Sequence, residues 1–145
     1  MKCTTVIDLT REEEVLIYTH KKTSLTAQIE ALVNEQSTEI VGYSEKQIAT
    51  LHQSEIVCFT VEDGKVLALT PQGRWQVRQR LYELEATLGS DFVKINQSCI
   101  ANIKMIDRFD ASLGGSLLVF FKNGYRDYVS RRQLKSVKER IGFRL

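Results

Sequence analysis

The chain has 145 residues, of which 43% are hydrophobic and 26% charged, a composition typical of a soluble globular domain. No apolar run approaches the roughly 20 residues that a membrane-spanning helix needs, and the N-terminus lacks the apolar core of a secretion signal. The three cysteines are widely spaced and form no CxxC pair, which argues against a disulfide framework or a zinc site and favours a reducing cytoplasm.

The charge is distributed unevenly along the chain. Residues 1–45 carry four Lys or Arg and eight Asp or Glu, a net charge of −4, whereas residues 46–145 carry +6. The last 24 residues alone hold eight Lys or Arg and two acids. Such asymmetry is typical of a module that binds a polyanion and carries an acidic appendage. A basic helix that is merely solvated is the alternative that charge alone leaves open.

The first third of the chain predicts two strands and a helix. Apolar residues alternate within residues 5–9 and residues 15–18, which flank a charged connector, and both runs are expected to be strands. A helix is expected from about Leu25 to Asn34, with Thr23 or Ser24 as its N-terminal cap. These elements are too few to bury a core alone, so they must pack on the rest of the chain or on a second copy.

From Ile40 onward the pattern is one of short strands joined by tight turns. Asp63-Gly64 favours a two-residue hairpin turn with positive φ at both positions, and Asn123-Gly124 is expected to turn the chain in the same manner. Pro71-Gln72-Gly73 marks another turn. The hairpins expected from these turns join residues 56–61 to 65–70, 65–70 to 74–77, and 117–121 to 125–129.

Two further helices lie between these hairpins and at the end of the chain. Val77, Leu81, Leu84 and Leu88 have helical spacing and are followed by Gly89. A last helix is expected to begin after Ser130 as its cap and to end at Gly142. The predicted class is mostly β with short helices.

Nothing in the sequence points to catalysis. The two histidines have no neighbouring metal-ligand partner, and no glycine-rich phosphate loop, nucleophile elbow or HExxH motif occurs. The consecutive acids Glu12-Glu13-Glu14 fit a solvated connector better than an acid/base pair. We therefore expect no enzyme, no cofactor and no metal.

A polar run interrupts the apolar segment that begins at Phe92. Asn96-Gln97-Ser98 supplies three consecutive hydrogen-bonding side chains after Ile95. Asn and Gln amides suit adenine, and Ser suits a phosphate oxygen. An Asx-type turn between two strands is the alternative reading of this run.

Two arginines open the last predicted helix. Arg131 and Arg132 stand in its first turn, where the helix dipole favours acids instead. A locally unfavourable choice indicates that another demand, such as a phosphate or a guanine, sets the positive charge there. A solvent-exposed basic turn is the alternative.

At these two segments the sequence resembles the LytTR family of bacterial DNA-binding domains. The family pattern of a phenylalanine, a basic residue, an apolar residue, a polar pair, Ser and a later Asn is matched, as is its closing Val-Ser-Arg-Arg before a basic helix. The family often has His-Arg or His-Asn before the serine, where this chain has Asn96-Gln97. The matching residues are Phe92, Lys94, Ile95, Asn96, Gln97, Ser98, Asn102 and Val129-Ser130-Arg131-Arg132.

The resemblance implies a LytTR-type fold of about ten strands in three sheets, whose loops enter the major groove of double-stranded DNA. It implies Gln97 and Arg132 as base readers and a residue near Lys65 as a third contact. The residues that it implies as phosphate contacts or as residues that shape the loop are Lys94, Asn96, Ser98, Asn102 and Arg131.

The resemblance also implies how the chain is organised. Residues 43–145 would be the DNA-binding domain, and residues 1–42 a β-β-α segment for dimerisation or regulation, too short to be a receiver domain. The layout is similar to a stand-alone subgroup, which implies a cytoplasmic homodimer and a small integral membrane regulator protein as a partner. A protein-interaction module whose basic C-terminal surface binds an acidic partner is the alternative function.

Overall fold

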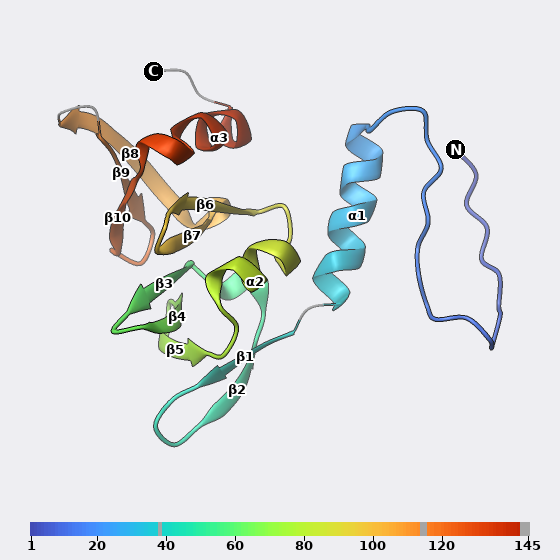
Figure 1. Cartoon of the computed structure of the whole chain (residues 1–145), viewed down its shortest axis with the longest axis horizontal. Coiled ribbons are helices and arrows are strands. Elements are labelled where there is room, and N and C mark those ends of the chain that lie inside the picture. The colour runs from blue at the N-terminus through green and yellow to red at the C-terminus, as the bar shows by residue number, and fades with distance from the viewer. Residues whose placement is uncertain (38, 114–115, 143–145) are drawn as a thin grey trace.

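The structure is a computed structural model that describes residues 1–37, 39–113 and 116–142. Within these ranges it contains ten strands, three α-helices and two short 3-10 helices (Figure 1). The expectation of a mostly β protein with short helices is confirmed. No helix within these ranges is long and apolar enough to cross a membrane.

Seven of the strands form one antiparallel sheet, in the order β2-β1-β5-β4-β3-β7-β6. The other three form a second sheet, in the order β10-β9-β8. The β1–β2 hairpin joins the first sheet through a single residue pair, Tyr43 with Gln76, so it is nearly a third sheet. The strand bounds are β1 Ile40–Tyr43, β2 Ile48–Leu51, β3 Cys58–Glu62, β4 Lys65–Thr70, β5 Gly73–Val77, β6 Phe92–Asn96, β7 Cys99–Asn102, β8 Ile106–Leu113, β9 Ser116–Phe121 and β10 Arg126–Val129.

The turns at Asp63-Gly64 and Asn123-Gly124, predicted to be alike, have different backbone conformations. Asp63 and Gly64 have φ values of 52° and 74°, as a two-residue hairpin turn of this kind requires. At the β9–β10 turn only Gly124 has a positive φ, and the Asn123 side chain instead accepts a hydrogen bond from the Tyr125 N–H at 3.0 Å. An Asx turn replaces the second expected hairpin turn because the asparagine side chain takes the place of a backbone acceptor.

The helices are α1 Ser24–Ser37, α2 Leu81–Thr87 and α3 Arg131–Ile141, with 3-10 helices at Gln53–Glu55 and Ile103–Met105. The helix expected from Val77 begins four residues later. Val77 is the last residue of β5, is buried and pairs with Val66. It therefore belongs to the sheet and not to the helix. Helix α3 ends at Gly142 in the left-handed conformation, as expected.

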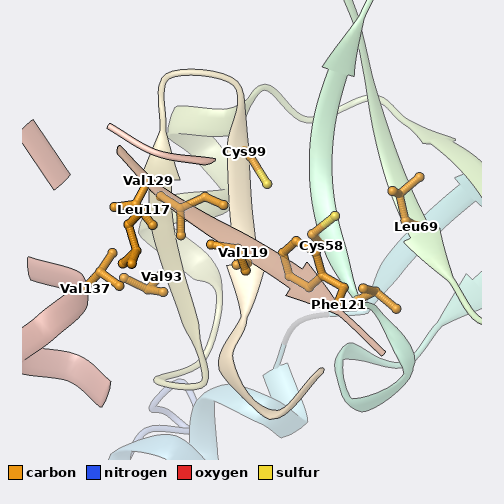
Figure 2. Packing of buried hydrophobic residues seen from close by; sticks show 12 residues of the cluster. Cys58, Leu69, Val93, Cys99, Leu117, Val119, Phe121, Val129 and Val137 are labelled. Carbon is orange, nitrogen blue, oxygen red and sulfur yellow. The ribbon is translucent and has the colours of Figure 1, made fainter. Parts of the chain in front are cut away.

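The core holds the two sheets and α3 together. Figure 2 shows Cys58 and Leu69 from the first sheet, Val119 and Phe121 from the second, and Val137 from α3 in one buried cluster. A second cluster packs α2 on the seven-stranded sheet. Arg140 of α3 also donates to the backbone carbonyls of Ser90 and Phe92, next to the start of β6. The packing therefore fixes α3 relative to β6.

The N-terminal runs do not form the predicted strands. Residues 5–9 and 15–18 have no strand assignment, and the backbone there makes only a turn, from Arg11 N–H to the Asp8 carbonyl at 3.4 Å. A strand needs a hydrogen-bonding neighbour, and in Figure 1 these residues lie beyond α1, on the side away from the sheets. The predicted strands are wrong for a single chain, whereas the helix expected from Leu25 to Asn34 lies within α1.

The expected boundary between residues 42 and 43 falls inside β1. Ile40 is 1% exposed and belongs to the second core cluster, with α2 and Phe59. The β1 strand is thus continuous with the sheet from Ile40 onward.

Candidate nucleic-acid interface

The β6–β7 turn presents two of its three polar side chains to solvent. Gln97 and Ser98 are exposed at the tip of the turn, whereas Asn96 is only 2% exposed. Asn96 Oδ1 accepts a hydrogen bond from the Ser98 N–H at 2.8 Å, which is an Asx turn. The Asx turn that the sequence left open as an alternative is therefore formed, and Gln97 is exposed within it.

The Asn96 amide also reaches a different part of the chain. Its Nδ2 donates to the Asp127 carboxylate oxygen Oδ1 at 2.9 Å and to the Tyr128 carbonyl oxygen at 2.8 Å. Both amide hydrogens and the carbonyl of this side chain are thus engaged inside the protein. Of the two roles that the resemblance implies for Asn96, these contacts favour that of shaping the loop.

A backbone hydrogen bond ties the same two segments together. The Ser130 N–H donates to the Ile95 carbonyl oxygen at 2.9 Å, one residue before the turn. Ser130 is the N-cap residue of α3, as expected, but its side chain makes no capping hydrogen bond. Arg131 and Arg132 follow it, both exposed. The first turn of α3, with Arg131 and Arg132, therefore begins next to the β6–β7 turn, and the Gln133 N–H in this turn donates to the Ser130 carbonyl oxygen at 3.0 Å.

The β3–β4 hairpin adjoins this pair of segments. The Val61 N–H donates to the Ser98 carbonyl oxygen at 3.1 Å. Lys65 is exposed at the start of β4, opposite Glu62. The Glu62 carboxylate lies 2.8 Å from the Arg74 guanidinium, so part of the acidity of this hairpin is neutralised. The three segments expected to contact DNA are joined by hydrogen bonds.

Two further predicted residues, Lys94 and Asn102, lie on the strands that flank the β6–β7 turn. Asn102, at the far end of β7, is 2% exposed; its amide donates to the Ile56 carbonyl at 2.9 Å and accepts from the Lys104 N–H at 3.1 Å. Both hydrogen bonds of this side chain therefore lie inside the fold. Lys94 is half-buried on β6, and its Nζ lies 3.9 Å from the Glu85 carboxylate, a weak pair that DNA could replace.

Asp127, which lies at the centre of this hydrogen-bond network, was not identified from the sequence. The Asp127 carboxylate accepts hydrogen bonds from Asn96, from the Tyr128 N–H at 2.8 Å and from the Tyr125 hydroxyl at 3.1 Å. Thr60 lies 3.3 Å from the Tyr125 oxygen. The sequence offered one indication of this role, because Asp127 is an acid in a strongly basic segment. A count of charges registers such a residue only as a lower net charge.

Burial in this network changes the titration of its neighbours. Removal from water raises the pKa of the Tyr125 hydroxyl above its ordinary value of 10.0. A hydrogen bond with Cys58, together with burial, raises the pKa of the Cys99 thiol. Cys99 directly follows the β6–β7 turn, and its thiol stays protonated and buried there.

Comparison with known protein families identifies the domain that carries this surface. Residues 46–142 match the LytTr DNA-binding domain family. The chain belongs to the LytTR family. It is therefore a DNA-binding protein, and the segments described above are part of its LytTR domain.

Relatives of the LytTR protein agree with this assignment. It is 36% identical over 107 residues to an HTH-type transcriptional regulator of Staphylococcus aureus strain RF122, and 35% identical over 107 residues to one of strain NCTC 8325. The matches cover 74% of this chain and 73% of each relative. The solved LytTr DNA-binding domain of a Bacillus cereus protein has the same fold, with a TM-score of 0.69 at 19% identity, over 73% of this chain and 98% of that one.

Proposed function

We propose that this LytTR protein regulates bacterial transcription by binding specific duplex DNA through the β6–β7 turn and the start of α3, which enter the major groove. The observation that carries the proposal is the junction at Asn96. Three hydrogen bonds, from Asn96 and Ser130, join the turn that carries the exposed Gln97 to the helix start that carries two exposed arginines. A preorganised surface of this kind can discriminate between base sequences.

The proposal gives each exposed side chain a role. Gln97 and Arg132 read base edges, because a primary amide and a guanidinium can each make two parallel hydrogen bonds to a base. Ser98, Arg131 and Lys94 bind phosphates. Lys65 on the adjoining hairpin supplies the third contact. Asn96 positions the turn and touches no DNA.

The regulator acts in the cytoplasm as a homodimer on paired sites. A two-fold symmetric protein matches a repeated half-site and adds the two binding energies on one duplex. A small integral membrane protein, the second partner implied by the resemblance, would restrain the chain from a surface other than the DNA-contacting turns. No chemical step and no cofactor enters this account.

Selection of bound sequences from a pool of random duplex DNA tests the proposal. The full-length protein should enrich a repeated motif, and its affinity should fall steeply with salt, by about 0.9 in the log–log slope for each phosphate contact. The Arg131→Ala variant should lower that slope by nearly one unit. A protein that enriches no motif would bind an acidic partner or DNA backbone alone, and the proposal would then fail.

A further inference from the structure

A cavity lies between a turn of the first sheet and a turn of the second. It has a volume of about 390 Å³, within the range of roughly 300–1,000 Å³ that is typical of small-molecule sites. One wall consists of residues 69–74, from the end of β4 to the start of β5, and the other of Asn123 and Tyr125 at the β9–β10 turn. None of the described residues that line the cavity belongs to the β6–β7 turn or to α3.

Hydrogen bonds hold both walls of the cavity in place. The Thr70 hydroxyl donates to the Gly73 carbonyl oxygen at 3.1 Å, across the β4–β5 turn. On the other wall, the Tyr125 N–H donates to Asn123 Oδ1 at 3.0 Å, and the Tyr125 hydroxyl donates to the Asp127 carboxylate at 3.1 Å. The cavity is therefore preformed, so a ligand can bind with little ordering of the chain.

The lining of the cavity favours an anion with an apolar body. Of the described lining residues, Arg74 alone is charged at neutral pH, and its guanidinium has five N–H donors in a fork that matches a carboxylate. The apolar part of the lining comes from Leu69, Pro71 and Tyr125. A small carboxylate with an aromatic or branched aliphatic body meets both requirements.

Arg74 also connects the cavity with the hairpin proposed to contact DNA. Its Nη1 lies 2.8 Å from the Glu62 carboxylate. Glu62 pairs with Lys65 across the β3–β4 hairpin, so this carboxylate lies beside a proposed DNA contact. An anion bound to Arg74 competes with Glu62 for the same guanidinium. A Glu62 carboxylate that loses Arg74 then repels the phosphates of DNA.

We propose that the cavity binds a small carboxylate effector, which lowers the affinity of the protein for DNA by drawing Arg74 away from Glu62. The site does not depend on the proposed function, whereas its effect on DNA binding rests on it. An exposed ion pair of this kind changes an equilibrium by about two- to fivefold, which sets the expected size of the effect. Because coupling is reciprocal, DNA should weaken the binding of the carboxylate by the same factor.

An NMR titration of the full-length protein without DNA tests the site, with benzoate as the probe. Benzoate should shift the amide signals of residues 69–74 and 123–125 in a saturable manner, with a dissociation constant on the order of 1 mM. Benzamide, which has a similar shape and no charge, should bind about tenfold more weakly.

Two arginine variants show whether the charge of Arg74 is responsible. Arg74→Gln should weaken benzoate binding by about tenfold, because it removes the charged partner. The matched control is Arg78→Gln, an exposed arginine outside the lining, which should bind benzoate like the wild type. Shifts that do not saturate, that lie elsewhere on the protein, or that are equal for benzamide and in Arg74→Gln would overturn the site.

The affinity for a selected duplex tests the coupling. Saturating benzoate should lower the DNA affinity of the wild type by about two- to fivefold relative to the same concentration of chloride, which keeps the contribution of salt equal. Arg74→Gln, which lacks the pair with Glu62, should not respond to benzoate. An unchanged DNA affinity of the benzoate-bound wild type would overturn the regulatory effect. If benzoate binds as expected but no duplex is selected, the site is supported and the proposed function fails.

Discussion

Asn96 is the residue on which the arrangement of the interface depends most. Its side chain is buried and makes three hydrogen bonds that join the β6–β7 turn to the end of β10. Its neighbour Gln97 is exposed and makes no comparable bond within the turn. Adjacent residues of similar chemistry thus have different roles, one shaping the loop and the other facing solvent.

Replacing these two neighbours should therefore have different effects. Asn96→Ala removes one donor from the Asp127 carboxylate, one donor from the Tyr128 carbonyl and the acceptor of the Ser98 N–H, and it should lower the free energy of unfolding by about 1–3 kcal/mol. Gln97→Ala should change it by less than about 0.5 kcal/mol, as expected for an exposed position. Urea denaturation of both variants measures the difference. Equal stabilities would show that the Asn96 bonds contribute little.

Tyr125 gives the fold a dependence on alkaline pH. Because burial raises the pKa of its hydroxyl above 10.0, the folded state keeps the proton that the unfolded state loses. The resulting stabilisation is complete below pH 10 and declines as the pH rises above it. Cys99 acts in the same sense from about pH 9 upward, since its pKa is also raised.

The variant Tyr125→Phe isolates this contribution. It should be less stable than the wild type at pH 8, because the Asp127 carboxylate loses the donated hydrogen bond. Above pH 10 the gap should narrow, because the phenylalanine has no proton to lose. Urea midpoints between pH 8 and pH 11 provide the measurement, and a gap that widens with pH would contradict the assignment.

The candidate interface and the contacts that shape it could be predicted from the sequence only in part. The exposure of Gln97 and of the two arginines follows from their places in a turn and at a helix start, which local patterns reveal. The partners of Asn96 lie 31 and 32 residues away, and no local pattern encodes a pairing at that distance. The same holds for Asn102, whose amide partner Ile56 lies 46 residues earlier.

At the scale of elements, β-strands were predicted well where a tight turn supplies the partner. The β3–β4 hairpin has the turn geometry that Asp63-Gly64 indicates. The long strand β8 was not predicted, although Gly114-Gly115 follows it in the sequence and is a dipeptide that favours two-residue hairpin turns. The N-terminal runs have a strand pattern but no partner within the chain. A period-two pattern reports which side chains can share a face, and pairing depends on the rest of the molecule.

The β1–β2 hairpin depends on a close approach at Gly42. A methyl group at position 42 would lie 2.8 Å from both Trp75 Cβ and Leu51 Cδ1, and one of these contacts is to an atom next to the backbone. Gly42→Ala should therefore lower the free energy of unfolding by about 1–3 kcal/mol through overpacking.

The control for this prediction is Thr50→Ala on the neighbouring strand. Thr50 is exposed and pairs with Val41, so its truncation should cost less than about 0.5 kcal/mol. Thermal or urea unfolding of Gly42→Ala and Thr50→Ala measures the two changes in the free energy of unfolding. A Gly42→Ala protein as stable as the wild type would show that the hairpin shifts freely on β5.

At the scale of the whole molecule, the acidic part of the chain includes the N-terminal segment and also strand β1 of the sheet. The acidic residues 1–45 include the segment that lies away from the sheets, and the basic remainder contains the turns proposed to contact DNA. The uneven charge was visible in the sequence and indicated a polyanion. It could not show which face would carry the basic residues, because that depends on how α3 packs against β6.

The central claim is that the LytTR protein reads DNA through Gln97 and Arg132. The affinities of Gln97→Ala and Arg132→Ala for a duplex selected from random DNA test it most directly. The controls are Gln72→Ala and Lys122→Ala, exposed residues at the β4–β5 and β9–β10 turns, at the opposite ends of strands that lead to the interface.

Each of the two interface variants should lose about 1–3 kcal/mol on the selected duplex and little on random DNA, while both control variants bind like the wild type. Equal losses on both DNAs would reduce Gln97 and Arg132 to backbone contacts. Unchanged affinity of both variants for the selected duplex would contradict the claim and place the reading surface elsewhere on the domain.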